Sequence, residues 1–155
     1  MSYNKKELKN YLKQLLKGKT ELSNFSFEYR SGQAAFHTRL RIVISSEKIT
    51  HLRVPRGTPI DPSKESKAAK KREINFSSDK LSEFIQVLIK KKIWDLENCT
   101  ERVLPDAVSL LFSIRDKDNI LFEQKTWEIC RNDNRQTKEL LKSIARLLPP
   151  DWPPP

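Results

Sequence analysis

The chain has 155 residues, of which 37% are hydrophobic and 32% charged, and its formal net charge at pH 7 is +10. This length fits a single domain, and the apolar fraction excludes a globally disordered chain. No apolar run approaches the roughly 20 residues that cross a bilayer, and the first residues, MSYNKKELKN, carry charges where a secretory signal is apolar. We therefore expect a cytoplasmic protein that does not associate with membranes.

The segment NKKELKNYLKQLLKG, residues 4–18, is typical of an amphipathic helix. Its apolar residues recur every three or four positions and are Leu8, Tyr11, Leu12, Leu15 and Leu16. Gly18 is expected to end the helix, because glycine readily adopts the left-handed backbone found after helix C-termini. Six lysines and one glutamate give residues 1–20 a net charge of +5, and we interpret most of these lysines as a solvated helix face.

Alternating apolar and polar residues then predict three strands. In NFSFEYRSG, Phe25, Phe27 and Tyr29 alternate with polar residues, and Ser31 and Gly32 are expected to form the closing turn. In FHTRLRIVIS one face holds Phe36, Leu40, Ile42 and Ile44, and the other holds His37, Arg39 and Arg41. KITHLRV is the third strand, with His51 expected to point outward, and a short turn at residues 45–47 joins it to the second.

A long basic loop follows, in which Pro55, Pro59 and Pro62 prevent regular strand pairing. We expect this loop to be mobile over residues 55–71. Strand character returns in REINF, and the helix after it has Ser77 or Ser78 as its cap, with Asp79 near its positive end. The apolar stripe of this helix consists of Leu81, Phe84, Ile85, Leu88 and Ile89.

The pattern of residues 107–129 predicts a β-hairpin with its turn at residues 116–119. Its first strand should point Val108, Leu110, Phe112 and Ile114 inward. In the second strand the apolar residues Leu121 and Phe122 are adjacent, so a regular strand would point them to opposite faces. This indicates a β-bulge. A last helix, capped within residues 132–134, should bury Leu140, Leu141, Ile144, Leu147 and Leu148.

This order of elements predicts an α+β fold, a mainly antiparallel β-sheet with α-helices packed on one face, because short turns join consecutive strands. The order is helix, three strands, loop, strand, helix, hairpin, helix. We expect one globular domain over residues 1–148. The Pro-rich residues 149–155, PPDWPPP, should form an extended tail.

The region from residue 73 to residue 148 has a recognisable layout. A helix ends in an aromatic-Asp-Leu step at residues 94–96, a Pro-Asp step at residues 105–106 precedes the hairpin, and a helix closes the region. This layout resembles that of the emfourin-like small bacterial proteins, some of which inhibit thermolysin-type metalloproteases. The resemblance implies a shared architecture and an inhibitory activity, although the first 35 residues and the basic loop are additional to that layout.

The residues that could carry catalysis or hold a metal are scattered. His37, His51, Cys99 and Cys130 lack the paired spacing of zinc ligands, and two cysteines form no disulfide framework. The acidic side chains near residue 100 fall in a wet loop and are Asp95, Glu97, Glu101 and Asp106. We therefore expect no enzyme, no metal and no cofactor, and we expect reduced thiols, although the spacing of the two cysteines does not decide whether they pair.

The segment from residue 53 to residue 72 also has a net charge of +5. Its candidate contacts to phosphate or nucleic acid are Arg53, Arg56, Lys64, Lys67, Lys70, Lys71 and Arg72. It contains no aromatic residue on which a base could stack. We therefore expect a protein-interaction or regulatory module with a protein partner, and the alternative is binding to a phosphate backbone. The sequence does not indicate an oligomeric state.

Overall fold

The computed structural model describes residues 4–33, 37–54, 70–97, 108–128, 134–152 and 154–155, with only the backbone for Gln33, His37 and Thr38. Its regular elements in chain order are α1 (Lys5–Leu16), η1 (Leu22–Asn24), β1 (Phe25–Gln33), β2 (His37–Ser45), β3 (Lys48–Arg53), β4 (Lys70–Asn75), α2 (Ser78–Lys90), η3 (Ile93–Asp95), β5 (Val108–Asp116), β6 (Asn119–Trp127) and α3 (Arg135–Leu147).

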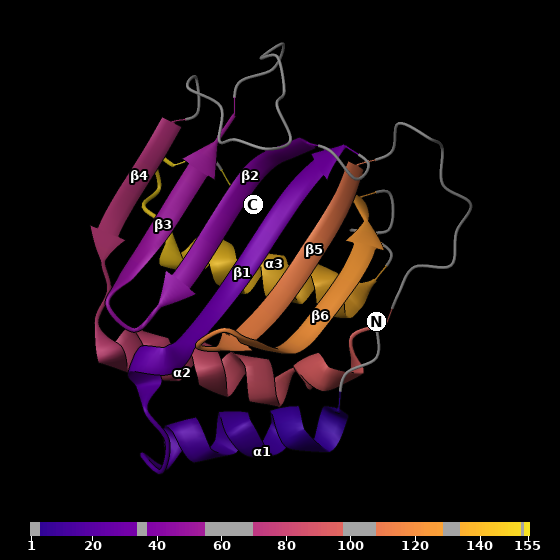
Figure 1. Cartoon of the computed structure of the whole chain (residues 1–155). Helices are drawn as coiled ribbons and strands as arrows, with labels where there is room; N and C mark the ends of the chain where they lie inside the picture. Colours follow the sequence, from indigo (N-terminus) through magenta and orange to yellow (C-terminus); the bar gives the residue numbers. More distant parts are fainter. Residues whose placement is uncertain (1–3, 34–36, 55–69, 98–107, 129–133, 153) are drawn as a thin grey trace.

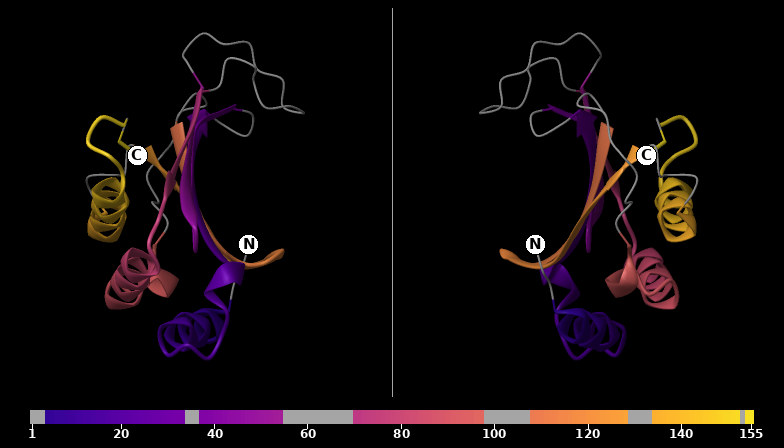
Figure 2. Two further views of the ribbon diagram at one scale, coloured as in Figure 1. Left: turned by 90° about the vertical axis from the view of Figure 1, so that its left-hand side faces the viewer. Right: turned by 90° about the vertical axis from the view of Figure 1, so that its right-hand side faces the viewer.

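The six strands form one antiparallel sheet in the order β4-β3-β2-β1-β5-β6, so that β4 and β6 are its edges (Figure 1). Figure 2 shows α2 and α3 on one side of this sheet and α1 beside α2, below the lower end of the sheet. None of the described helices covers the opposite side, which faces the viewer in Figure 1. The predicted α+β fold is thus confirmed.

The helix-facing side of the sheet and the three helices share one apolar core. Strand pairing places Phe27, Ile44, Ile114 and Phe122 side by side, and each is 0% exposed. Phe84 of α2 meets Phe27 edge to face, with the ring centroids 5.2 Å apart. Burial of each such side chain contributes about 1.5–3 kcal/mol. The apolar core therefore lies on the helix-facing side of the sheet, and the opposite side carries no described helix.

The helix caps follow the sequence predictions. The Ser77 hydroxyl accepts a hydrogen bond from the Lys80 N–H at 3.3 Å, and the Asn134 side chain accepts one from the Thr137 N–H at 3.0 Å. These contacts satisfy backbone donors that have no partner within the helix. The predicted stripes are confirmed for the buried residues Leu81, Phe84, Ile85, Leu88, Leu140, Leu141, Ile144 and Leu148, while Ile89 and Leu147 are half-buried.

Gly18, predicted to terminate helix α1, lies two residues after its last residue Leu16 and has a φ of +72°. The Gly18 N–H donates to the Leu15 carbonyl at 3.3 Å, and the Lys19 N–H donates to the Gln14 carbonyl at 3.0 Å. A left-handed residue at this position allows the last carbonyls of the helix to be satisfied. Leu16 shares the helical spacing of the apolar residues, yet its side chain is exposed.

We expect Gly18→Ala to lower the free energy of unfolding by about 1–2 kcal/mol, the usual cost of a Cβ in left-handed backbone. No described atom lies within 4 Å of that Cβ, so the loss reflects backbone conformation rather than a clash. Urea denaturation followed by circular dichroism measures the change. The control is Gly18→Asn, because asparagine tolerates this conformation better. Equal losses for the two variants would contradict the explanation.

Two strand boundaries differ from the prediction. Strand β1 does not turn at Ser31 and Gly32 but continues to Gln33, with an irregularity in its pairing to β2 at that step. The reason is that β1 pairs on both sides there, and the Ser109 hydroxyl of β5 donates to the Gly32 carbonyl at 3.2 Å. Strand β4 begins at Lys70, so the end of the predicted loop belongs to the sheet. The rest of that loop lies outside the described residues.

The hairpin of β5 and β6 confirms the predicted turn and bulge. Ile114 pairs with Phe122 while Arg115 pairs with Ile120, so Leu121 is the extra residue. Lys117 in the turn has a φ of +53°. The bulge explains why Leu121 and Phe122 have opposite parity in the sequence.

The C-terminal residues are not the extended tail that the sequence suggests. The Trp152 N–H donates to the Pro149 carbonyl at 3.0 Å, which forms a turn. The half-buried indole of Trp152 packs against the core and against His51 of β3, with the ring centroids 5.4 Å apart. The free energy of burying this large ring favours a folded end over a solvated one.

Candidate functional site

The open face of the sheet, the side without helices, is centred on a nearly buried carboxylate. Glu28 of β1 is 7% exposed. Arg30 Nε donates to Glu28 Oε1 at 3.0 Å, and Arg41 Nε of β2 donates to the same oxygen. The two arginine side chains are 39% and 37% exposed, so both guanidinium groups remain at the surface.

A second carboxylate on this face is also held by two cations. Glu73 of the edge strand β4 lies 3.3 Å from the ammonium groups of both Lys48 and Lys71. Hydrogen bonds from Lys71 and Lys48 hold the pKa of the Glu73 carboxyl below its usual value. Each cluster has one carboxylate and two cations, so its net charge is one positive charge.

The two clusters meet at a hollow of about 250 Å³ that spans β2, β3 and β4. The register places Thr50 between Val43 and Glu73, and Leu52 between Arg41 and Lys71. The hollow is lined by Arg41, Val43, Lys48, Thr50, Leu52, Lys71 and Glu73. It therefore combines an apolar floor with three cations and a single carboxylate.

The open face as a whole is also positively charged, because its basic side chains outnumber its acidic ones. The basic side chains that the six strands direct to this face are Arg30, Arg39, Arg41, Lys48, Lys71, Arg115 and Lys125, against the acidic Glu28, Glu73 and Glu123. At the far edge Lys125 Nζ lies 4.8 Å from the centroid of the Trp127 ring, a cation–π contact. Chemically, such a face can hold carboxylate or phosphate groups by ion pairing and hydrogen bonding.

The four described residues among the candidate contacts named from the sequence lie on both faces of the sheet. Lys71 lines the hollow. Three other candidates, Arg53, Lys70 and Arg72, instead point to the helix-facing side of the sheet at its β3–β4 edge. The strand register aligns them with the core residues Leu40 and Ile42, which face the helices. The remaining candidates, Arg56, Lys64 and Lys67, lie outside the described residues.

His51 was expected to point outward and is instead 1% exposed on the helix-facing side. The reason is the position of Ile49, which pairs with Ile44 and Ile74 and fixes the parity of β3. Since His51 has the parity of Ile49, it lies toward the core and packs on Trp152. The side chains of His37, Cys99 and Cys130 are not among those described.

Sequence reasoning missed most of the open face. It assigned Arg39 and Arg41 correctly, because they alternate with the apolar residues of a single strand. Arg30, Lys48, Arg115 and Lys125 lie far apart in the sequence, and only the strand order brings them to one surface. Their parity in the predicted strands was the available signal.

The described residues include neither a metal-binding cluster nor a helix that could cross a membrane. No group of three or more His, Cys, Asp or Glu side chains there is placed to hold a metal ion. Within the same residues, no helix is long and apolar enough to cross a membrane.

No protein-family model matches the chain, and no curated protein matches it. The resemblance to emfourin-like proteins accordingly stays a prediction.

Proposed function

We propose that this chain is a non-enzymatic protein-interaction module and that its open sheet face binds an acidic surface of a partner protein. The observation that carries the proposal is the hollow between β2, β3 and β4, where Arg41, Lys48 and Lys71 surround an apolar floor. Protein interfaces commonly combine an apolar centre with arginine, tryptophan and a polar rim.

Two features favour a protein over nucleic acid as the partner. The carboxylates Glu28 and Glu73 lie among the cations and would repel a continuous phosphate backbone, whereas an acidic protein surface has gaps between its charges. Among the side chains described on this face, Trp127 is the one Trp, Tyr or Phe ring, and Lys125 lies over it. Single-stranded nucleic acid usually stacks its bases on several exposed rings.

A single observation favours nucleic acid as the second candidate, namely the formal net charge of +10. Excess positive charge attracts any polyanion at low salt. The two candidates differ in salt dependence, because binding to nucleic acid releases condensed counterions in proportion to the phosphates contacted.

We expect the double variant Lys48→Glu, Lys71→Glu to weaken binding of a labelled oligoglutamate peptide about tenfold, since reversal of two charges at the hollow costs about 1.4 kcal/mol or more. Fluorescence anisotropy at two salt concentrations measures the affinity. The matched control is Lys138→Glu, Lys142→Glu, which makes the same charge change at exposed positions of α3.

Oligothymidylate serves as the competing probe in the same titration. Tighter binding of oligothymidylate than of the peptide, with a steeper salt dependence, would replace the protein partner by nucleic acid. Equal losses in the α3 control and the hollow variant would contradict the assignment of the hollow, because net charge alone would then account for the effect.

A further inference from the structure

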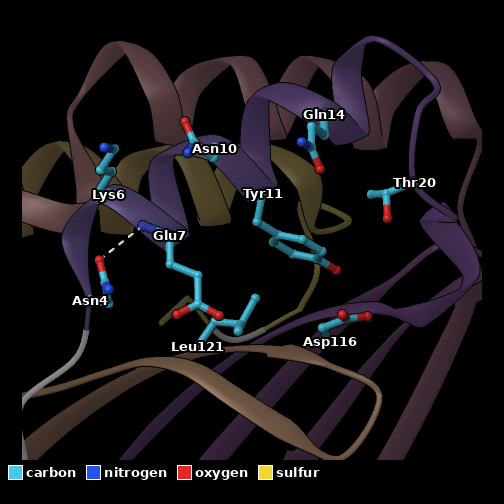
Figure 3. Close-up of a pocket in the computed structure, with 9 residues that line it drawn as sticks. All are labelled: Asn4, Lys6, Glu7, Asn10, Tyr11, Gln14, Thr20, Asp116 and Leu121. Carbon is cyan, nitrogen blue, oxygen red and sulfur yellow. Dashed lines mark hydrogen bonds between the residues drawn. The ribbon is translucent and has the colours of Figure 1, made fainter.

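A separate pocket lies between α1 and the turn end of the β5–β6 hairpin (Figure 3). Its volume is about 540 Å³, within the range of pockets that hold small molecules. The residues that line it are Asn4, Lys6, Glu7, Asn10, Tyr11, Gln14, Thr20, Asp116 and Leu121. Most of them carry hydrogen-bonding groups, so the pocket suits a polar ligand.

Tyr11 provides the observation that points to a ligand. Its side chain is 8% exposed, and its hydroxyl oxygen is buried without a hydrogen-bond partner among the described residues. Figure 3 shows the ring extending from α1 with the hydroxyl directed toward Asp116 and Thr20. A buried hydroxyl without a partner destabilises the folded protein, so a ligand group that hydrogen-bonds to it binds more tightly for that contact.

The charge of the pocket is opposite to that of the protein as a whole. Its lining holds two carboxylates, Glu7 and Asp116, and one ammonium group, Lys6. In Figure 3 the Lys6 side chain extends away from the side of α1 on which Glu7, Tyr11 and Asp116 lie. A cation in the pocket would therefore meet carboxylates rather than the lysine.

The lining groups come from elements that are held in place. The Asn4 side chain caps α1 by accepting from the Glu7 N–H at 3.1 Å, which fixes the turn that carries Glu7. Asp116 pairs with Phe25 of β1, and the adjacent Lys117 N–H donates to the Asn24 carbonyl at 2.8 Å. Rigid placement of this kind lowers the entropic cost of binding a ligand.

Burial and the nearby Asp116 carboxylate raise the pKa of the Tyr11 hydroxyl far above its usual value. The hydroxyl therefore stays neutral and can both donate and accept a hydrogen bond. It could accept from an ammonium N–H while the carboxylates balance the charge.

We propose that the pocket between α1 and the hairpin binds a small aliphatic diamine, with one ammonium group held by Asp116 and the Tyr11 hydroxyl and the other by Glu7, whose carboxylate lies apart from them in Figure 3. This site is distinct from the hollow on the open face and shares no lining residue with it. Its test therefore succeeds or fails independently of the proposed protein partner.

The test titrates putrescine into the full chain by calorimetry, with butanediol and succinate as neutral and anionic probes of similar length. We expect putrescine alone to bind. Asp116→Asn should weaken it about tenfold or more, since a charge-assisted hydrogen bond is lost, and Tyr11→Phe about fivefold. The control is Asp118→Asn, the same chemical change at an exposed turn residue outside the pocket.

Circular dichroism confirms that each variant is folded before its affinity is interpreted. Absence of putrescine binding to the folded wild-type chain would overturn the proposal. Equal binding of butanediol or succinate would overturn it too, because the carboxylates would then not select a cation. The same holds if Asp118→Asn weakens binding as much as Asp116→Asn does.

Discussion

Replacing Phe27 with Ala is expected to lower the free energy of unfolding by about 3–5 kcal/mol, the usual cost of removing a fully buried phenylalanine ring. Phe27 lies on the central strand β1. Its ring centroid lies 5.2 Å from that of Phe84 in α2 and 6.4 Å from that of Phe112 in β5. The substitution would leave a cavity where the sheet meets α2. A domain with an ordinary stability of about 5–15 kcal/mol would then be close to unfolding.

Urea denaturation of purified protein measures this change, and Ile120→Ala is the matched control. Ile120 is exposed near the start of β6, so its truncation should change stability by no more than about 0.5 kcal/mol. If the two variants lose similar stability, Phe27 does not form part of the contact between sheet and helix. If Phe27→Ala yields no soluble protein, Phe27→Leu provides a smaller loss of the same sign.

Local periodicity was enough to predict most of the fold. Phe25, Phe27 and Tyr29 alternate on β1, and the stripe from Leu81 to Leu88 repeats at helical spacing behind a serine cap. These patterns arise because each element must bury one side. The boundaries that failed depend on contacts between elements. Nothing near Gly32 in the sequence says that β5 pairs with it and prolongs the strand.

The candidate site was harder to predict, because charge along the sequence is not charge on a surface. Lys70, Lys71 and Arg72 are consecutive, yet the alternation of a strand directs Lys71 to the open face and its neighbours to the helix-facing side. Arg30 and Lys48 belong to residues 21–52, whose net charge is only +1, and still lie on the same basic face as Lys71. Only the order of the strands reveals that surface.

The centre of the open face leads to the second large expected effect. Glu28→Gln should lower the free energy of unfolding by about 1.5–3 kcal/mol, because the hydrogen bonds that Arg30 and Arg41 donate lose their charged carboxylate acceptor at a nearly buried position. The matched control is Glu73→Gln, which also removes a carboxylate held by two cations. Glu73 is exposed, so solvent replaces its contacts and its loss should be the smaller one.

Glu28→Gln should lower stability but raise the affinity for an acidic partner. Without the Glu28 carboxylate, the positive charges of Arg30 and Arg41 are no longer balanced from within the face. Removal of one negative charge there should strengthen binding of the oligoglutamate peptide, by about two- to fivefold at low salt. Denaturation and anisotropy on the same sample measure both effects. If Glu28→Gln lowers stability and peptide affinity together, Glu28 supports the shape of the face, and these arginines do not provide the charge that holds an acidic partner.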